Sequence, residues 1–331
     1  YSRALMHSVY DKAKRRPKRI VFPEGDHEKI IRAARILAEE GIAHPILLGK
    51  RDELERKLSD LDIAEGAITI IDPEQSPDLE RYIQRFHEIR RRSGVTLSDA
   101  RTRLTSRNYF AMLMMDAGDA DGAISGLRTY YPATIRPALQ VISTRPTVRR
   151  VSGAYILVFK SRLVILADTT VNIEPSAEDL AEIAILTAET AKRFELEPRI
   201  AMLSFSNFGS TKHPLQDKVR RAVEIVRTRH PDLAIEGEMQ ADIAVMPDIA
   251  KSDYPWSVIQ GDANVLICPD LQSANIAYKL LWRLGGAEAI GPILQGLSKP
   301  VHVLQRGVDV SDIVNMAAIA VIDAQEIEDR G

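Results

Sequence analysis

The sequence predicts an α/β fold, because strand patterns and helix patterns alternate along almost all of its 331 residues. Short apolar runs end in turns, and stretches with apolar residues at helical spacing follow them. A chain of this length can bury a large core, which suggests two domains or one large one. We therefore expect a largely parallel sheet with helices packed on it.

The first half of the chain supplies several of these elements. Residues 2–15 are expected to form a helix, and Arg19 to Phe22 reads as a strand that ends in a turn. Residues 27–41 repeat apolar residues at helical spacing and stop at Gly41. Further strands are expected at 44–49, 67–72 and 121–126, with helices through Tyr82, Phe86 and Ile89 and from Tyr131 onward.

The second half repeats the alternation. Residues 153–160 and 162–168 look like two strands joined by a short turn. The helix expected over 176–194 has Ser176 as its N-cap candidate and Asp179 three residues later, which is the pattern of a capping box. Further strands are expected at 199–206, 233–238, 263–270 and 299–304, with helices over 274–284 and from Asp309 to the end of the chain.

Composition and charge favour a protein of a reducing compartment, and we expect it in the cytoplasm. The formal net charge is −2, which gives no support for binding to nucleic acid or to a membrane. Cys268 is the single cysteine, so no disulfide can form within the chain. The longest apolar stretch, 154–167, is interrupted by Lys160, Ser161 and Arg162, and we expect no membrane span or signal peptide.

Several common catalytic motifs are absent from the sequence. There is no Walker-type phosphate loop and no G-x-G-x-x-G after the first strand, which disfavours a nucleotidase or a dinucleotide dehydrogenase. Neither G-x-S-x-G nor H-E-x-x-H occurs. The seven histidines, His213 and His302 among them, lack metal-ligand spacing, so we expect no metal site in this chain.

Polar loops at strand ends are the remaining candidates for chemistry. Residues 125–137 offer hydroxyls and arginines beside a helix start, an arrangement that suits phosphate or carboxylate: Ser125, Arg128, Thr134 and Arg136. A capped helix with solvent-exposed arginines fits the same pattern. Residues 204–214 have a similar character, and Arg90 to Arg92 lie at an expected helix end, where cations also complement the helix dipole for structural reasons alone.

Longer stretches carry a resemblance to a known family. "RIVFPEGDHEKIIRAARILAEEGIAHPILLG", "DADGAISG", "ATIRPALQVI", "GEMQAD", "ANVLICPDLQSANIAYKLLWRLGGAEAIGPILQGLSKP" and "QRGVDVSDIVNMAAIAVIDAQ" occur in the order found in phosphotransacetylases. The resemblance implies two three-layer αβα domains with a cleft between them, as in isocitrate and isopropylmalate dehydrogenases, and a homodimer. It implies a first domain of residues 1–142 with 303–331, and a second of residues 143–302.

The resemblance also implies a site. The family motif before the last helix is Ser-Arg-Gly with an aspartate six residues beyond the arginine, which matches Arg306, Gly307 and Asp312. In the active enzymes the aspartate is implicated as the base for the coenzyme A thiol. Two further family arginines match Arg90 and Arg136. The expected acetyl-CoA ligands are therefore Arg90, Ser125, Arg128, Thr134, Arg136, Gln305, Arg306 and Asp312.

The sequence departs from the family at one site position, where Gln305 replaces the serine. Loss of a positioned transition-state donor commonly lowers a rate about 10²–10³-fold. Segments including "ADTTVNIEPSAEDLAEIA" and "KPVHVLQRG" resemble the C-terminal phosphotransacetylase-like domain of hybrid NADP-dependent malic enzymes, and a start at Tyr1 fits an excised domain. This second resemblance implies a regulatory domain that binds acetyl-CoA as an effector.

We therefore expect a domain with no catalytic residues of its own, which passes acetyl-CoA inhibition to an upstream malic enzyme domain that holds NADP and a divalent metal. Its partners would be acetyl-CoA, the upstream domain and a second copy in a larger homo-oligomer. Two alternatives stay open: an active phosphate acetyltransferase that tolerates Gln305, and a purely structural dimerisation module.

Overall fold

The computed structural model describes residues 2–61, 63–64 and 66–330. They form two compact units, which are described separately. The N-terminal unit contains residues 6–146 together with the last segment from Leu297. The central unit contains residues 147–296 together with the start of the first helix.

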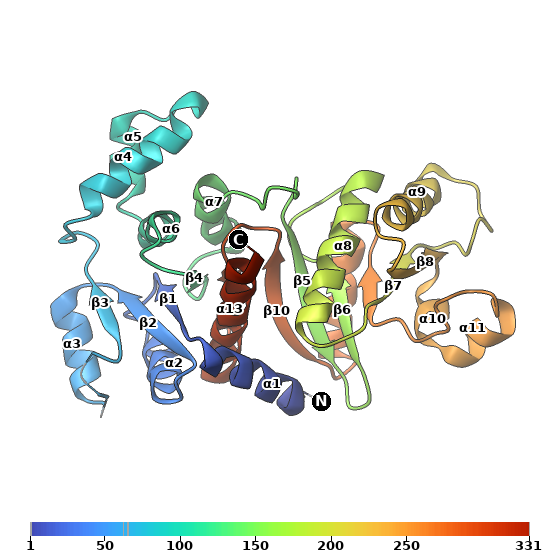
Figure 1. Cartoon of the computed structure of the whole chain (residues 1–331), viewed down its shortest axis with the longest axis horizontal. Helices are drawn as coiled ribbons and strands as arrows, with labels where there is room; N and C mark the ends of the chain where they lie inside the picture. Colours follow the sequence, from blue (N-terminus) through green and yellow to red (C-terminus); the bar gives the residue numbers. More distant parts are fainter. Residues whose placement is uncertain (1, 62, 65, 331) are drawn as a thin grey trace. The chain divides into compact units, whose positions relative to one another are not determined.

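The N-terminal unit is built on a parallel sheet with the strand order β11-β4-β1-β2-β3. Figure 1 labels its strands β1 to β4. Its innermost strands are apolar because helices cover the sheet, as is usual for parallel sheets. Ile20, Val21 and Phe22 are fully buried. The strands are β1 Lys18–Phe22, β2 Ala43–Leu48, β3 Thr69–Ile71, β4 Gly122–Ser125 and β11 Val301–Val303.

The last helix of the chain lies in the core of this unit. It packs against the second helix and against the central strands, and its residues from Met316 to Gln325 are all buried. The helices are α1 Ser2–Arg15, α2 Glu28–Glu39, α3 Arg51–Ser59, α4 Leu79–Arg90, α5 Leu97–Arg103, α6 Arg107–Ala117, α7 Tyr131–Val141 and α13 Val310–Arg330, with a 3₁₀ turn at Arg91–Ser93.

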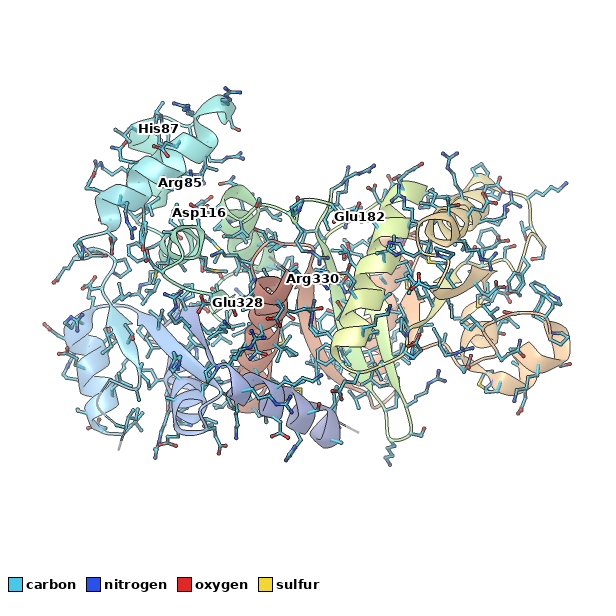
Figure 2. The ribbon with its side chains drawn as sticks, in the orientation of Figure 1. Arg85, His87, Asp116, Glu182, Glu328 and Arg330 are labelled. Carbon is cyan, nitrogen blue, oxygen red and sulfur yellow. The ribbon has the colours of Figure 1, made fainter. Side chains whose placement is uncertain are left out.

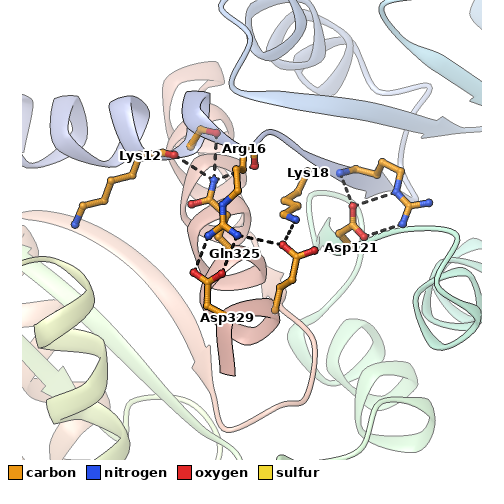
Figure 3. A network of polar contacts seen from close by, with 9 residues as sticks. Lys12, Arg16, Lys18, Asp121, Gln325 and Asp329 are labelled. Carbon is orange, nitrogen blue, oxygen red and sulfur yellow. Dashed lines mark hydrogen bonds and ion pairs between the residues drawn. The ribbon is translucent and has the colours of Figure 1, made fainter. Parts of the chain in front are cut away.

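Polar contacts fix the C-terminal end of α13 (Figure 3). The Gln325 amide donates to the carbonyl oxygens of Lys12 and Arg16 at the end of α1, at 3.1 and 2.9 Å. The Arg16 guanidinium donates to Asp329 at 2.6 and 2.8 Å. α13 also packs against β4 and β11.

The central unit has a mixed sheet with the order β10-β5-β6-β9-β7-β8. β6, β9, β7 and β8 are parallel, whereas β5 runs antiparallel to both of its neighbours. The largely parallel α/β fold predicted from the sequence is confirmed. The exception is β5, which is antiparallel to β6 and β10. The strands are β5 Ser152–Val158, β6 Leu163–Ala167, β7 Arg199–Leu203, β8 Ala234–Met239, β9 Val265–Ile267 and β10 Glu288–Gln295.

The helices of the central unit include the one with the predicted capping box. The Asp179 N–H donates to Ser176 Oγ at 3.1 Å, and the Ser176 N–H donates to the Asp179 carboxylate at 3.0 Å. The helices are α8 Ala177–Arg193, α9 Pro214–Arg229, α10 Ala241–Val245, α11 Pro247–Asp253 and α12 Leu271–Arg283. Among the residues that the structure describes, none of the helices is both long and apolar enough to cross a membrane.

Candidate active site

Three neighbouring strands of the N-terminal unit end at one edge of its sheet. β11, β4 and β1 are adjacent and parallel, so the loops that follow them start side by side. Ligands of open α/β sheets commonly bind at the carboxyl ends of such strands. The loops after β4 and β11 approach closely, because the Leu304 N–H donates to the Ser125 carbonyl at 2.7 Å.

Gly126 makes this approach possible. Its φ is +124°, a conformation that side chains other than glycine's rarely adopt. A Cβ atom at this position would lie 2.6 Å from the Leu304 carbonyl oxygen. A substitution here would therefore push apart the two loops that carry Arg128, Gln305 and Arg306.

Glu24, in the loop after β1, holds the loop after β4. Its carboxylate accepts the backbone N–H groups of Gly126, Leu127 and Arg128 at 3.0, 2.9 and 2.7 Å. The side chain is buried, with 8% of its surface exposed. These three N–H groups are thus occupied by a protein carboxylate, and they are not a ready-made binding site for a phosphate.

Asp26, two residues further on, binds two arginines. Its Oδ1 accepts from Arg107 and from Arg128, both at 2.8 Å. Burial alone would raise the pKa of Asp26, but the hydrogen bonds and charges of Arg128 and Arg107 outweigh it and hold the pKa below its ordinary value. The guanidinium of Arg128, expected to bind ligand, is therefore already partly neutralised.

Arg306 is the cation that this edge presents. It is exposed, and its guanidinium carbon lies 4.1 Å from the ring centre of Tyr130. No hydrogen bond or ion pair of Arg306 occurs among the residues that the structure describes. Tyr130 is itself 71% exposed, at the N-cap of α7. The stack fixes the arginine while it leaves the N–H donors free.

The start of α13 brings two carboxylates together. The Asp312 N–H donates to Asp309 Oδ1 at 2.9 Å, and the Asp309 N–H donates to Asp312 Oδ2 at 3.0 Å. Burial and the neighbouring Asp309 charge raise the pKa of Asp312. Hydrogen bonds from the Asp312 backbone and the Ser311 hydroxyl lower the pKa of Asp309. The pKa of Asp312 is thus raised and that of Asp309 lowered, and paired carboxyl groups in active sites often differ in this way.

Two other expected ligands have partners inside the unit. Ser125 and Thr134 are each 2% exposed. The Ser125 hydroxyl donates to Asn108 at 2.8 Å, and the Thr134 hydroxyl lies 2.6 Å from that of Thr129. Both hydroxyls are thus buried and hydrogen-bonded within the unit, which disfavours contact with a ligand.

The two remaining expected arginines lie on the helices α7 and α4. Arg136 is exposed on α7, which packs against β11 and α6. Arg90 ends α4, and its Nε is buried without a hydrogen-bond partner in the described part of the chain. α4 is tied to α6 by the pair Arg85–Asp116, 2.6 Å between Nε and Oδ2, and Figure 2 shows both side chains between these helices.

Other reactive side chains lie outside this edge. Cys268 is buried in the central unit, and burial raises the pKa of its thiol to about 12, so it is a poor nucleophile. His302 is fully buried and lies 2.7 Å from Asp323 on α13. In the described ranges, no three His, Cys, Asp or Glu side chains are grouped so that they could hold a metal ion.

Comparisons with known proteins identify relatives of the whole chain. Residues 4–321 match the family model "phosphate acetyl/butaryl transferase". A phosphate acetyltransferase of Bacillus subtilis is 42% identical over 97% of this chain and 99% of its own length. One of Nitratidesulfovibrio vulgaris is 42% identical over 96% of this chain, which spans 45% of that protein. A crystal structure of a phosphotransacetylase from Streptococcus pyogenes superposes with a TM-score of 0.94, at 44% identity over 98% of this chain and 99% of that one.

These relatives correct the expected function. The prediction of a regulatory domain of an NADP-dependent malic enzyme is wrong, because relatives matched over nearly their entire length are named phosphate acetyltransferases. The predictions that the parent protein is an oxidoreductase and that it uses NADP are wrong for the same reason. That expectation rested on Gln305 and on segments that resemble the malic enzyme domain, and the similarity to phosphate acetyltransferases over nearly the whole chain outweighs both. Over nearly its whole length, the chain belongs to the phosphate acetyl/butaryl transferase family.

Proposed function

We propose that this chain is a phosphate acetyltransferase, which transfers an acetyl group between coenzyme A and inorganic phosphate. This was the alternative to a regulatory domain, and the names of its full-length relatives support it. Acetyl-CoA is then a substrate and not an effector.

One observation carries the proposal: an exposed cation and a half-buried carboxylate both lie on the segment that follows β11, at one edge of the sheet. Arg306 and Asp312 are six residues apart, on the loop and first helical turn that follow β11. A guanidinium suits a phosphate, to which it can donate two parallel hydrogen bonds. A carboxylate of raised pKa is a stronger base than an ordinary aspartate.

The chemistry of acetyl-CoA formation assigns a task to each. Asp312 takes the proton from the coenzyme A thiol, whose ordinary pKa is about 8.5, and so produces a nucleophilic thiolate. The sulfur attacks the carbonyl carbon of acetyl phosphate. The bond from that carbon to the phosphate oxygen then breaks, and phosphate leaves with the electron pair. Arg306 stabilises the negative charge on the leaving phosphate.

Gln305 takes the place of a hydroxyl in this scheme. Its amide N–H can donate to the carbonyl oxygen as negative charge develops there, which is the role that the family resemblance gives to the serine. Amide side chains serve as oxyanion donors in other acyl-transfer enzymes. The substitution therefore changes the donor without removing it.

The remaining cations are candidates for the phosphates of coenzyme A. Arg136 is exposed on α7, and the buried Nε of Arg90 has no hydrogen-bond partner in the described part of the chain. Arg128 contributes less charge, because Asp26 already binds it. We assign Ser125 and Thr134 to the support of the loop and not to ligand binding.

The direct test is acetyl-CoA formation from acetyl phosphate and coenzyme A by the purified chain. We expect turnover within the ordinary enzyme range of about 1–10³ per second. Arg306→Ala should lower kcat/KM about 10- to 150-fold, since a charge-assisted hydrogen bond contributes about 1.5–3 kcal/mol. Arg229→Ala, an exposed arginine of α9, is the matched control. A folded wild-type chain without turnover would overturn the proposal.

The homodimer expected from the family resemblance stays a prediction. Light scattering coupled to size-exclusion chromatography would test it, with a mass of twice 36.9 kDa as the expected result.

A further inference from the structure

We infer that Asp309 is a positioning residue that orients the Asp312 carboxylate and strengthens it as a base. The inference rests on the proposed function, in which Asp312 accepts the thiol proton. Asp309 itself does not touch the reacting atoms in this scheme.

Reciprocal hydrogen bonds carry the positioning part. The backbone N–H of Asp309 holds Oδ2 of Asp312, and the backbone N–H of Asp312 is held by Oδ1 of Asp309. The Ser311 hydroxyl also donates to Asp309 Oδ1, at 2.7 Å. One oxygen of Asp312, Oδ2, is thus fixed by a backbone donor, and the carboxyl groups of Asp312 and Asp309 are also within hydrogen-bonding reach of each other. A base needs such a fixed orientation.

Charge carries the second part. Asp309 receives donors from Asp312 and Ser311, and its anion is well stabilised. Asp312 is half-buried and has the Asp309 charge as a neighbour. A like charge disfavours ionisation, so the proton goes to Asp312 in preference to Asp309. The two aspartates therefore have different roles: Asp312 accepts the proton, and Asp309 stays charged and positions Asp312.

Other charged and titratable groups surround this helix end. Arg306 precedes it on the same loop, and it is unchanged in the variants below. Lys29 of α2 donates to the Val308 carbonyl at 2.6 Å, and its charge opposes the effect of Asp309 on Asp312. Tyr10 of α1 donates to Asn315, one turn along α13. Neither is changed in the variants below, so a difference between the variants reports Asp309.

A helix cap alone would produce the same hydrogen bonds. Asparagine caps helices about as well as aspartate does, and it carries no charge. A purely structural role therefore predicts that Asp309→Asn changes neither the thermal midpoint nor the pH dependence. The inferred role predicts an unchanged midpoint and a changed pH dependence. Asp309→Ser, another uncharged cap, provides the same test if Asp309→Asn fails to fold.

The experiment measures kcat/KM for coenzyme A against pH, and titrates the Asp312 carboxyl carbon by NMR. In Asp309→Asn we expect both the acid limb and the carboxyl titration to move to lower pH, because a neighbouring negative charge is removed. Asp270→Asn is the matched control, because Asp270 caps α12 through the Ser273 N–H at 2.7 Å. It should leave both curves in place.

Two outcomes separate this inference from the proposed function. If the carboxyl titration of Asp312 is the same in Asp309→Asn and in the wild type, the inference is wrong, whatever the activity. If the titration moves but the wild type makes no acetyl-CoA, the proposed function is wrong while the electrostatic coupling of the two aspartates stands.

Discussion

The guanidinium of Arg306 lies over the ring of Tyr130, with 4.1 Å between the guanidinium carbon and the ring centre. The two residues come from loops that follow adjacent strands, β11 and β4. An arginine held by a carboxylate would have part of its charge neutralised, as Arg128 has on Asp26. An arginine held by a ring keeps its charge and its donors for a phosphate.

Replacing Tyr130 by leucine should therefore weaken phosphate binding. A cation–π contact at an exposed site contributes about 0.5–1 kcal/mol, so the KM for phosphate should rise about two- to fivefold, with little change in kcat. Steady-state kinetics in the direction of acetyl phosphate formation measure this. Tyr130→Phe retains the ring and should behave as the wild type. Equal KM values for all three proteins would mean that the stack does not orient Arg306.

Gln305 offers a second test at the same loop. If its amide donates to the developing oxyanion, Gln305→Ala should lower kcat about 10²–10³-fold and leave the KM for coenzyme A nearly unchanged. Gln305→Ser restores the hydroxyl of the family motif and should retain more activity than the alanine variant. Rapid-quench or steady-state assays both resolve this range. An alanine variant as fast as the wild type would remove Gln305 from the mechanism.

The strands were the most predictable part of the fold. Buried parallel strands read as continuous apolar runs, and every residue of β6 is buried. Other elements lacked such a signal. α3 buries a single residue, Leu54, and α6 is buried on all sides from Tyr109 to Met115, so neither shows an amphipathic repeat. β10 contains Gly291 and Pro292, which argue against a strand.

One omission had a readable signal. α9 buries Val219, Ala222, Val223 and Val226, which is helical spacing, and Pro214 opens it. This helix could have been predicted from the sequence, and it was missed.

The candidate site divides in a similar way. Arg306 and Asp312 follow from a local motif in the sequence. Glu24 and Asp26 do not, because their partners lie about 100 residues further along the chain, and "PEGD" alone looks like a turn. The pairing of Tyr130 with Arg306 likewise depends on which strands become neighbours. Tertiary contacts of this kind are not visible in a single sequence.

Asp26 predicts a pH dependence of stability. Its pKa is lower in the folded chain than its ordinary value, so the stabilising contacts with Arg107 and Arg128 are complete above the ordinary value and are lost as the pH falls through the folded one. Denaturant unfolding should therefore give a free energy that declines below about pH 4. In Asp26→Asn this decline should be smaller.

Asp248→Asn is the control for this series, because Asp248 is exposed on α11 and has no ion pair among the described residues. Its unfolding free energy should follow the wild-type curve. If Asp26→Asn follows that curve as well, the two arginines do not stabilise the charged form of Asp26.

Glu24 should matter for stability and for the site together. Its carboxylate accepts three backbone N–H groups of the loop that leads to Tyr130. Glu24→Gln keeps the shape but offers one carbonyl oxygen, while its NH₂ group faces N–H donors that it cannot satisfy. Hydrogen bonds to charged groups contribute about 1.5–3 kcal/mol each, and the unfolding free energy should fall by at least about that amount. Denaturant titration measures it, with the exposed Glu174→Gln as the matched control.

The same substitution should also affect the site. Because the loop held by Glu24 places Tyr130 against Arg306, the KM for phosphate should rise in Glu24→Gln. A variant with wild-type unfolding and wild-type kinetics would show that the loop holds its position without this carboxylate.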